Sequence, residues 1–139
     1  MDNFSKFVTL GALPDRRSDT IAQWLHANVV CLYGRPLLIK SDGGSEFKGA
    51  FKELCEMLEI RHHTTLPYHP QSNGMAERFV RTTKTYLLRH LANHDPATWE
   101  ETLPQIQFCI NTTIATPHGY TPYQLQFGTN VSQALDPRF

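Results

Sequence analysis

The sequence lacks the features that mark membrane, secreted and metal-knuckle proteins. No apolar run in its 139 residues approaches the roughly 18–20 residues that a membrane-spanning helix needs. The first residues include no apolar stretch typical of a signal peptide. Cysteine is scarce, and Cys31, Cys55 and Cys109 lie too far apart to form a disulfide framework or a zinc motif. We interpret the three as small core residues and expect a soluble, intracellular protein without a membrane partner.

An excess of charge of one sign is missing as well, since 13 Lys and Arg residues balance 13 Asp and Glu residues. Nucleic-acid binding must therefore come from a local cluster of charge, if it occurs at all. Apolar residues make up 40% of the chain and aromatic residues 11%, which is enough for a core and excludes a disordered protein. Repeats, low-complexity tracts and linkers are also lacking, so we expect residues 1–139 to form a single domain.

Hydrophobic periodicity predicts an α/β fold with about three strands and four to five helices. Strands are predicted at 4–10, 37–39 and 60–64. The strand at 37–39 is entirely apolar, which is typical of a buried parallel strand. Helices are predicted from a cap at Ser18 or Asp19 to Gly34, over 49–58, over 74–93, from Pro96 with a kink or split at Pro104, and from Pro122 to Gly128.

Two carboxylates stand out by their positions. Asp42 lies just past the C-terminal end of the strand at 37–39, where open α/β sheets place their ligand sites. Glu77 lies in the first turn of the longest predicted helix, where the helix dipole tolerates a negative charge. Taken alone, each has an ordinary explanation, as a turn residue and as a helix-capping residue.

The helix that carries Glu77 also carries a strip of positive charge. At 100° per residue, Arg81 and Lys84 fall near one line with Glu77, Asn73 and Leu88. The opposite side is the expected core face: Met75, Phe79, Tyr86 and His90. Residues 78–94 contain Arg78, Arg81, Lys84 and Arg89 and no acid, whereas a merely solvated face usually mixes both signs. A carboxylate for a hard cation beside positive charges for phosphate suits phosphodiester chemistry.

Three blocks of sequence resemble the integrase catalytic core of retroviruses and gypsy-type retrotransposons. They are Ser-Asp-Gly-Gly-Ser-Glu-Phe at 41–47, Tyr-His-Pro-Gln-Ser-Asn-Gly-Met-Ala-Glu-Arg at 68–78, and Asn-Thr-Thr at 111–113 with Gly-Tyr-Thr-Pro-Tyr at 119–123. The segment at 2–7 is also similar, so the resemblance covers essentially the whole chain in the order of the family.

The resemblance implies a ribonuclease-H-like fold with strand order 3-2-1-4-5. It also implies a site of two aspartates and one glutamate for two Mg²⁺ or Mn²⁺ ions. By this resemblance Asp42 is the second aspartate and Glu77 is the glutamate, both catalytic and both metal ligands. The DNA-binding residues that it implies are Tyr68, Asn73, Arg78, Arg81 and Lys84.

The implied activity is metal-dependent 3′-end processing and strand transfer on DNA. The implied partners are retroelement ends, target DNA and further copies of the chain, in the nucleus of a eukaryotic host.

The sequence departs from the family pattern at three points. The spacer between Asp42 and Glu77 is residues 43–76, one residue shorter than usual, with the shortening near 48–49. Gly43 stands where the family often has Asn or Arg, which we expect to loosen the turn at Asp42. The third departure is that the family's first aspartate has no counterpart, because Asp2 matches a later, non-catalytic position.

We therefore expect a core without the first strand and most of the second, with little or no catalysis by these 139 residues alone. Glu46 is the nearest substitute acid in the sequence. His62, His63 and His69 lack cysteine partners at zinc spacing. An alternative function is a non-catalytic, domesticated fragment that binds nucleic acid or an integrase-like partner, and a translated pseudogene is a further possibility.

Overall fold

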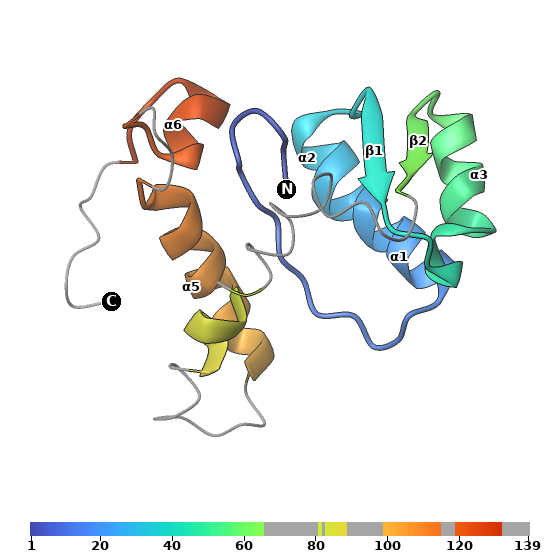
Figure 1. The fold of residues 1–139 in the computed structure, drawn as a ribbon, viewed down its shortest axis with the longest axis horizontal. Helices are drawn as coiled ribbons and strands as arrows, with labels where there is room; N and C mark the ends of the chain where they lie inside the picture. Colours follow the sequence, from blue (N-terminus) through green and yellow to red (C-terminus); the bar gives the residue numbers. More distant parts are fainter. Residues whose placement is uncertain (66–80, 82, 89–98, 115–118, 132–139) are drawn as a thin grey trace. The chain divides into compact units, whose positions relative to one another are not determined.

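The computed structural model describes residues 1–65, 81, 83–88, 99–114 and 119–131 (Figure 1). The chain forms two compact units, one of Gly11–Thr82 and the other of Met1–Leu10 with Thr83–Phe139. None of the described helices is both long and apolar enough to cross a membrane. That residues 1–139 form one domain stays a prediction.

In the unit Gly11–Thr82, the first helical segment runs without interruption from Ser18 to Tyr33. It consists of α1 (Ser18–Leu25), the π-helical turn η1 (His26–Val30) and α2 (Cys31–Tyr33). Gly34 ends it with a φ of 85°, a conformation that glycine adopts readily, and this confirms the predicted end.

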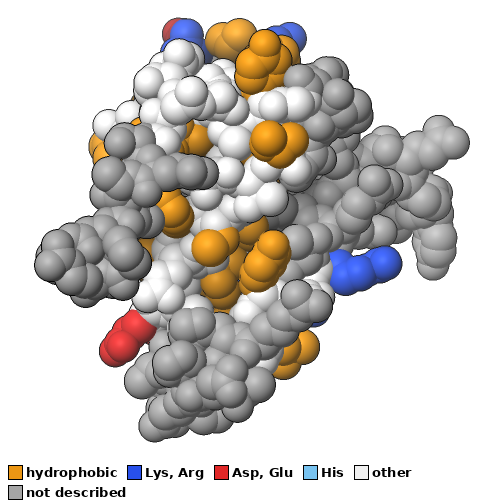
Figure 2. Space-filling view, turned by 90° about the vertical axis from the view of Figure 1, so that its left-hand side faces the viewer, with side chains coloured by type: hydrophobic (Ala, Val, Ile, Leu, Met, Phe, Trp, Pro, Cys, Tyr) orange, Lys and Arg blue, Asp and Glu red, His pale blue; other side chains and the backbone are white. Residues whose placement is uncertain are grey.

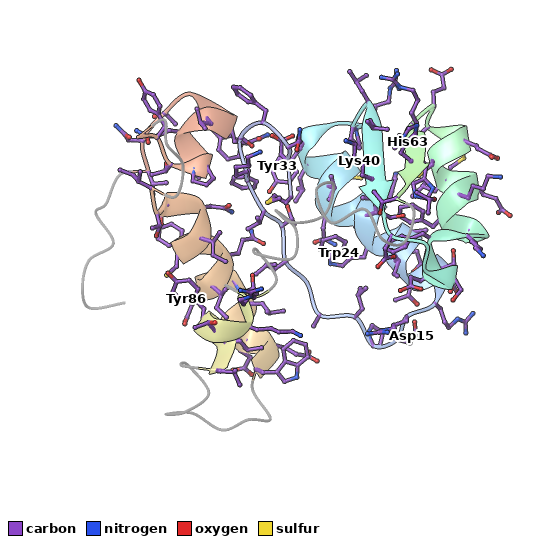
Figure 3. The ribbon with its side chains drawn as sticks, viewed as in Figure 1. Asp15, Trp24, Tyr33, Lys40, His63 and Tyr86 are labelled. Carbon is purple, nitrogen blue, oxygen red and sulfur yellow. The ribbon has the colours of Figure 1, made fainter. Side chains whose placement is uncertain are left out.

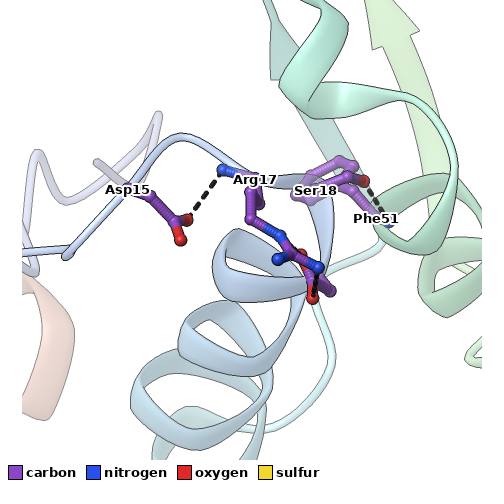
Figure 4. A network of polar contacts seen from close by, with 5 residues as sticks. Asp15, Arg17, Ser18 and Phe51 are labelled. Atoms are coloured by element: carbon purple, nitrogen blue, oxygen red, sulfur yellow. Dashed lines mark hydrogen bonds and ion pairs between the residues drawn. The ribbon is translucent and has the colours of Figure 1, made fainter.

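The predicted cap of this helix is wrong. Its N-cap is Arg17, and no side chain there makes a capping hydrogen bond. The Oγ of Ser18 instead accepts a hydrogen bond of 2.9 Å from the Phe51 N–H (Figure 4). It also donates one to the Lys48 carbonyl. Ser18 thus accepts from an N–H in the first turn of the helix that contains Phe51, and it does not cap the helix that begins at Ser18 itself.

In the described residues of this unit, two strands, β1 (Leu38–Ser41) and β2 (Arg61–Thr64), pair in parallel. They are joined through the 3-10 turn η2 (Ser45–Phe47) and the helix α3 (Ala50–Met57). The apolar residues of α3 recur every three or four positions and so fall on one face of the helix. That face, with Phe51 and Cys55, forms the core together with Ala22 of α1, Ile39 of β1 and Ile60, the residue before β2.

This arrangement confirms the α/β fold and the adjacency of the two strands. The expected burial of the strand at 37–39 is wrong, because Leu37 is 69% exposed and Leu38 is 39% exposed. The physical reason is that burial alternates along β1: Ile39 faces the core, whereas Leu38 lies on the opposite face, which the described residues leave uncovered. Cys55 is a core residue as predicted, whereas Cys31 and Cys109 are exposed.

In the second unit, the segment at residues 1–10 packs with α5 (Trp99–Thr112) and α6 (Pro122–Phe127). The predicted strand at 4–10 is wrong, since none of residues 1–10 forms a strand. Side-chain amides of α5 take the place of a neighbouring strand. Asn111 accepts from the Val8 N–H and donates to the Val8 carbonyl, both at 2.9 Å. Gln107, one turn earlier, accepts from the Leu10 N–H at 2.7 Å.

The helices α5 and α6 differ in how well they match their sequence signals. The start and end of α6 are as predicted, with a capping box between Thr121 and Gln124 and a left-handed Gly128. Of the expected kink or split at Pro104, the split is absent because α5 runs through that residue, and the kink stays a prediction. A proline removes one helical hydrogen bond, and the burial of Thr102 and Ile106 on either side holds the helix together.

Figure 2 shows hydrophobic side chains exposed on one face of the molecule.

Candidate active site

Asp42 follows β1 directly, and its side chain is exposed. The Gly44 N–H donates to Asp42 Oδ1 over 3.1 Å, which turns the chain away from the strand. The other carboxylate oxygen, Oδ2, has no hydrogen-bond or ion-pair partner among the residues that the structure describes. The structure thus places Asp42 where the sequence predicted it, with one oxygen held by the turn and the other available to a ligand.

The backbone before Asp42 is tied to the end of β2. The Ser41 carbonyl accepts two hydrogen bonds of 2.9 Å from Thr65, one from its N–H and one from its Oγ1. Ser41 Oγ donates to the Asp42 carbonyl over 2.9 Å and lies 2.8 Å from His62 Nε2. One residue earlier, Lys40 lies opposite His63 in the parallel register (Figure 3). Asp42 therefore extends from a backbone that contacts with β2 hold in place.

The loop after Asp42 is anchored at its far end as well. Phe47 packs edge-on against Phe51 with ring centroids 5.2 Å apart, and Phe51 is buried. Ser18 holds the Lys48 carbonyl, as described above. Gly49 then has a φ of 55°, so a residue with a side chain would be strained there. A glycine turn thus ends the loop at Gly49, and that the spacer is shortened near 48–49 stays a prediction.

Gly43 occupies an ordinary position within this loop. A Cβ at Gly43 would lie 3.9 Å from the methyl carbon of Thr64, which is a normal van der Waals distance. Its φ is not in the left-handed region. The hydrogen bonds at Ser41 and Gly44, and not residue 43, hold the turn, and that Gly43 loosens it stays a prediction.

His62 lies beside this turn on β2. Its ring packs edge-on against Phe51 with centroids 5.1 Å apart. Burial lowers the pKa of His62, and the positive charges of His63 and Lys52 lower it further. Residues 1–65, 81, 83–88, 99–114 and 119–131 contain no group of three or more His, Cys, Asp and Glu side chains able to hold a metal ion.

The remaining predicted site residues divide into two sets. Glu77, Tyr68, Asn73 and Arg78 lie outside the described residues, so the convergence of Glu77 with Asp42 stays a prediction. Arg81 and Lys84 are helical and exposed.

The segment 83–88 shows which face of this helix is turned inward. Leu88 is 70% exposed, as expected for a residue on the same side of the helix as Lys84. Tyr86 was placed on the core face, and this is wrong because it is 37% exposed. Thr83 and Leu87, one turn apart, are the more buried side chains.

The chain is similar to Pol proteins of retroviruses and retrotransposons, although no family model matches it. It is 28% identical over 127 residues to the Retrovirus-related Pol polyprotein from transposon 412 of Drosophila melanogaster, with 91% of this chain and 10% of that protein covered. Identity to the Pro-Pol polyprotein of simian foamy virus type 3 is 33% over 129 residues, which are 92% of this chain and 11% of that protein. Identity to the mouse Gypsy retrotransposon integrase-like protein 1 is 32% over 129 residues, which are 93% of this chain and 24% of that protein. The chain thus spans between a tenth and a quarter of the length of these relatives.

The similar solved structures are retroviral integrases. A simian T-cell lymphotropic virus intasome matches with a TM-score of 0.81 and 28% identity, covering 94% of this chain and 47% of that one. The HTLV-2 integrase catalytic core domain in complex with magnesium matches with a TM-score of 0.73 and 26% identity, covering 90% and 80%. The chain belongs to the retroviral and retrotransposon integrase-core family. Its described part has the α/β arrangement of the ribonuclease-H-like fold.

Asp42 offers one ligand of the type that a hard divalent cation prefers. A carboxylate oxygen is the ligand that Mg²⁺ and Mn²⁺ favour, and Asp42 Oδ2 is exposed and without a partner in the described residues. No group of three or more metal-ligating side chains includes Asp42 among the residues that the structure describes, so metal binding at Asp42 stays a prediction that depends on Glu77.

Three positions support the integrase core around Asp42 through contacts that the sequence did not reveal. They are Ser18, which caps α3, and His62 and Thr65, which both hold Ser41. The sequence marks Ser18 as a capping residue but does not say which helix it caps. The contacts of His62 and Thr65 with Ser41 depend on the pairing of two strands about 20 residues apart, for which the sequence carries no local signal.

Proposed function

We propose that this integrase core acts in DNA integration, with Asp42 and Glu77 as ligands of a catalytic divalent cation. The observation that carries the proposal is the position of Asp42. It is an exposed carboxylate at the carboxyl end of a parallel strand, with one oxygen held by Gly44, in a chain with the fold of integrase cores. When bound, the cation supplies charge stabilisation for phosphodiester cleavage and joining.

The chain's own residues have three separate tasks in this proposal. The Gly44 N–H and the Ser41 backbone orient the Asp42 carboxylate before the cation binds. Arg81 and Lys84 bind DNA phosphate and so position the substrate without reading its sequence. Lys84 suits this task because it is exposed and forms no ion pair with the carboxylates that the structure describes.

We extend the proposal to the partners of the chain. Its substrates are retroelement ends and target DNA, and its site of action in a eukaryotic host is the nucleus. Several copies act together, in keeping with the intasome among the similar structures and with the dimeric and trimeric forms of the HTLV-2 core.

The test is DNA joining with Mg²⁺ or Mn²⁺ by a longer chain, in which a first strand bearing the family's aspartate precedes Met1. We expect this chain to join DNA, and we expect the 139 residues alone not to, since they carry counterparts of only two of the three acids. Asp42→Asn should abolish joining, because it keeps the shape of the side chain and removes the charge that binds metal. Glu46→Gln is the matched control, since Glu46 lies in the same loop, and it should leave joining intact.

Two results would count against the proposal. Joining that survives Asp42→Asn but is lost in Glu46→Gln would show that Glu46, and not Asp42, binds the metal. A longer chain that is folded and binds DNA but never joins it would favour the non-catalytic fragment.

A further inference from the structure

Ser41 is a bridge between Asp42 and His62. Its Oγ lies 2.9 Å from the Asp42 carbonyl oxygen and 2.8 Å from His62 Nε2. A serine hydroxyl has a single hydrogen, which is used in the bond to the Asp42 carbonyl. With that hydrogen on the Asp42 carbonyl, the second bond is made by the His62 tautomer that is protonated at Nε2 and donates to Ser41 Oγ.

The imidazole of His62 is held in place for this role. It stands opposite Ile39 in the parallel register, and its ring packs on Phe51, which is 3% exposed. The Ser41 carbonyl is held at the same time by Thr65, from the residue that follows β2. Side chains at and just after β2 thus fix both oxygen atoms of Ser41, the residue that precedes Asp42.

We propose that His62 is a positioning residue for Asp42. By donating to Ser41 Oγ, it keeps the Ser41 hydroxyl on the Asp42 carbonyl and so fixes the direction in which the Asp42 carboxylate meets a hard divalent cation. This inference rests on the proposed function, because it needs Asp42 to be a metal ligand. Residues that orient a metal ligand from behind typically change metal affinity by about 10–100-fold when they are replaced.

The experiment measures Mn²⁺ binding to the 139-residue chain from the paramagnetic broadening of the Gly43 and Gly44 amide signals. His62→Phe keeps a ring against Phe51 but removes the donor, and it should weaken Mn²⁺ binding by about tenfold. His62→Gln restores an N–H donor and should bind within about twofold of the wild type, since the donor carries the effect. His63→Phe is the matched control, because His63 is the exposed neighbour on the same strand, and it should bind like the wild type.

Ser41→Ala tests the bridge without touching the core. It should weaken Mn²⁺ binding as much as His62→Phe does. The double variant Ser41→Ala/His62→Phe should bind Mn²⁺ no more weakly than either single variant, since both substitutions remove the same hydrogen bond. Thermal melting of each variant reports whether the chain is folded, and Ser41→Ala decides the matter if His62→Phe does not fold.

The outcomes separate the two proposals. Wild-type affinity in both Ser41→Ala and a folded His62→Phe overturns the positioning role alone. Broadening that persists in Asp42→Asn overturns the metal role of Asp42 and the positioning role with it. A loss in His63→Phe equal to that in His62→Phe also overturns the positioning role, because any change on β2 would then suffice.

Discussion

Asn111 stabilises the unit of residues 1–10 and 83–139 through two hydrogen bonds to one buried residue. Its side chain accepts from the Val8 N–H and donates to the Val8 carbonyl, and Val8 is 1% exposed. Asn111→Leu keeps nearly the same shape but leaves both backbone groups without a partner. Each buried, unsatisfied group costs about 1–3 kcal/mol, so for two groups we predict a loss of about 2–6 kcal/mol in the free energy of unfolding.

Urea denaturation measures this loss as a lower midpoint at an unchanged slope. Thr112→Ala is the control on the same helix. Its hydroxyl donates to the Phe108 carbonyl of its own helix at an exposed position, so its removal should cost less than about 0.5 kcal/mol. An Asn111→Leu chain within about 0.5 kcal/mol of the wild type would refute the reasoning, because the two hydrogen bonds would then contribute nothing measurable.

Three further predictions concern DNA binding, backbone strain and pH. Arg81→Ala or Lys84→Ala should weaken DNA binding equally for all sequences and lower the slope of log affinity against log salt by about one, measured by fluorescence anisotropy. A loss confined to one sequence would contradict this. Gly49→Ala should lower the free energy of unfolding by about 1–2 kcal/mol because its φ is 55°, whereas Gly43→Ala should be nearly neutral in the same melting experiment. Because burial lowers the pKa of His62, the unfolded chain binds more protons there, so stability should fall as pH drops through the ordinary histidine pKa of about 6.5. His62→Gln should remove that dependence, and an unchanged pH profile would contradict it.

Features with local signals were predictable from the sequence. Asp42 was placed correctly because an apolar run ends at it and a glycine pair follows. The helices α3 and α6 were found almost to the residue, because their apolar spacing, Pro122 and Gly128 all act within a few positions. These signals suffice because a helix or a turn satisfies its hydrogen bonds mostly within itself.

Features that depend on distant partners were not predictable. Residues 4–10 have the composition of a strand, but their backbone pairs with side chains of α5 about 100 residues away. Ser18 was recognised as a capping residue for the wrong helix, since its partner Phe51 is 33 residues along the chain. His62 was considered only as a zinc ligand, and its contact with Ser41 follows from the register of β1 and β2. A strand or a bridge of this kind is decided by which segments meet, and sequence patterns describe each segment by itself.

The most direct test of the metal site is the anomalous X-ray scattering of Mn²⁺ in crystals of this chain. We predict a peak at roughly 2.0–2.6 Å from one carboxylate oxygen of Asp42 and one of Glu77, since these are the distances at which hard cations bind oxygen. A peak that Asp42 does not contact, or Asp42 and Glu77 on opposite faces of the molecule, would contradict the assignment of these two residues as a shared metal site.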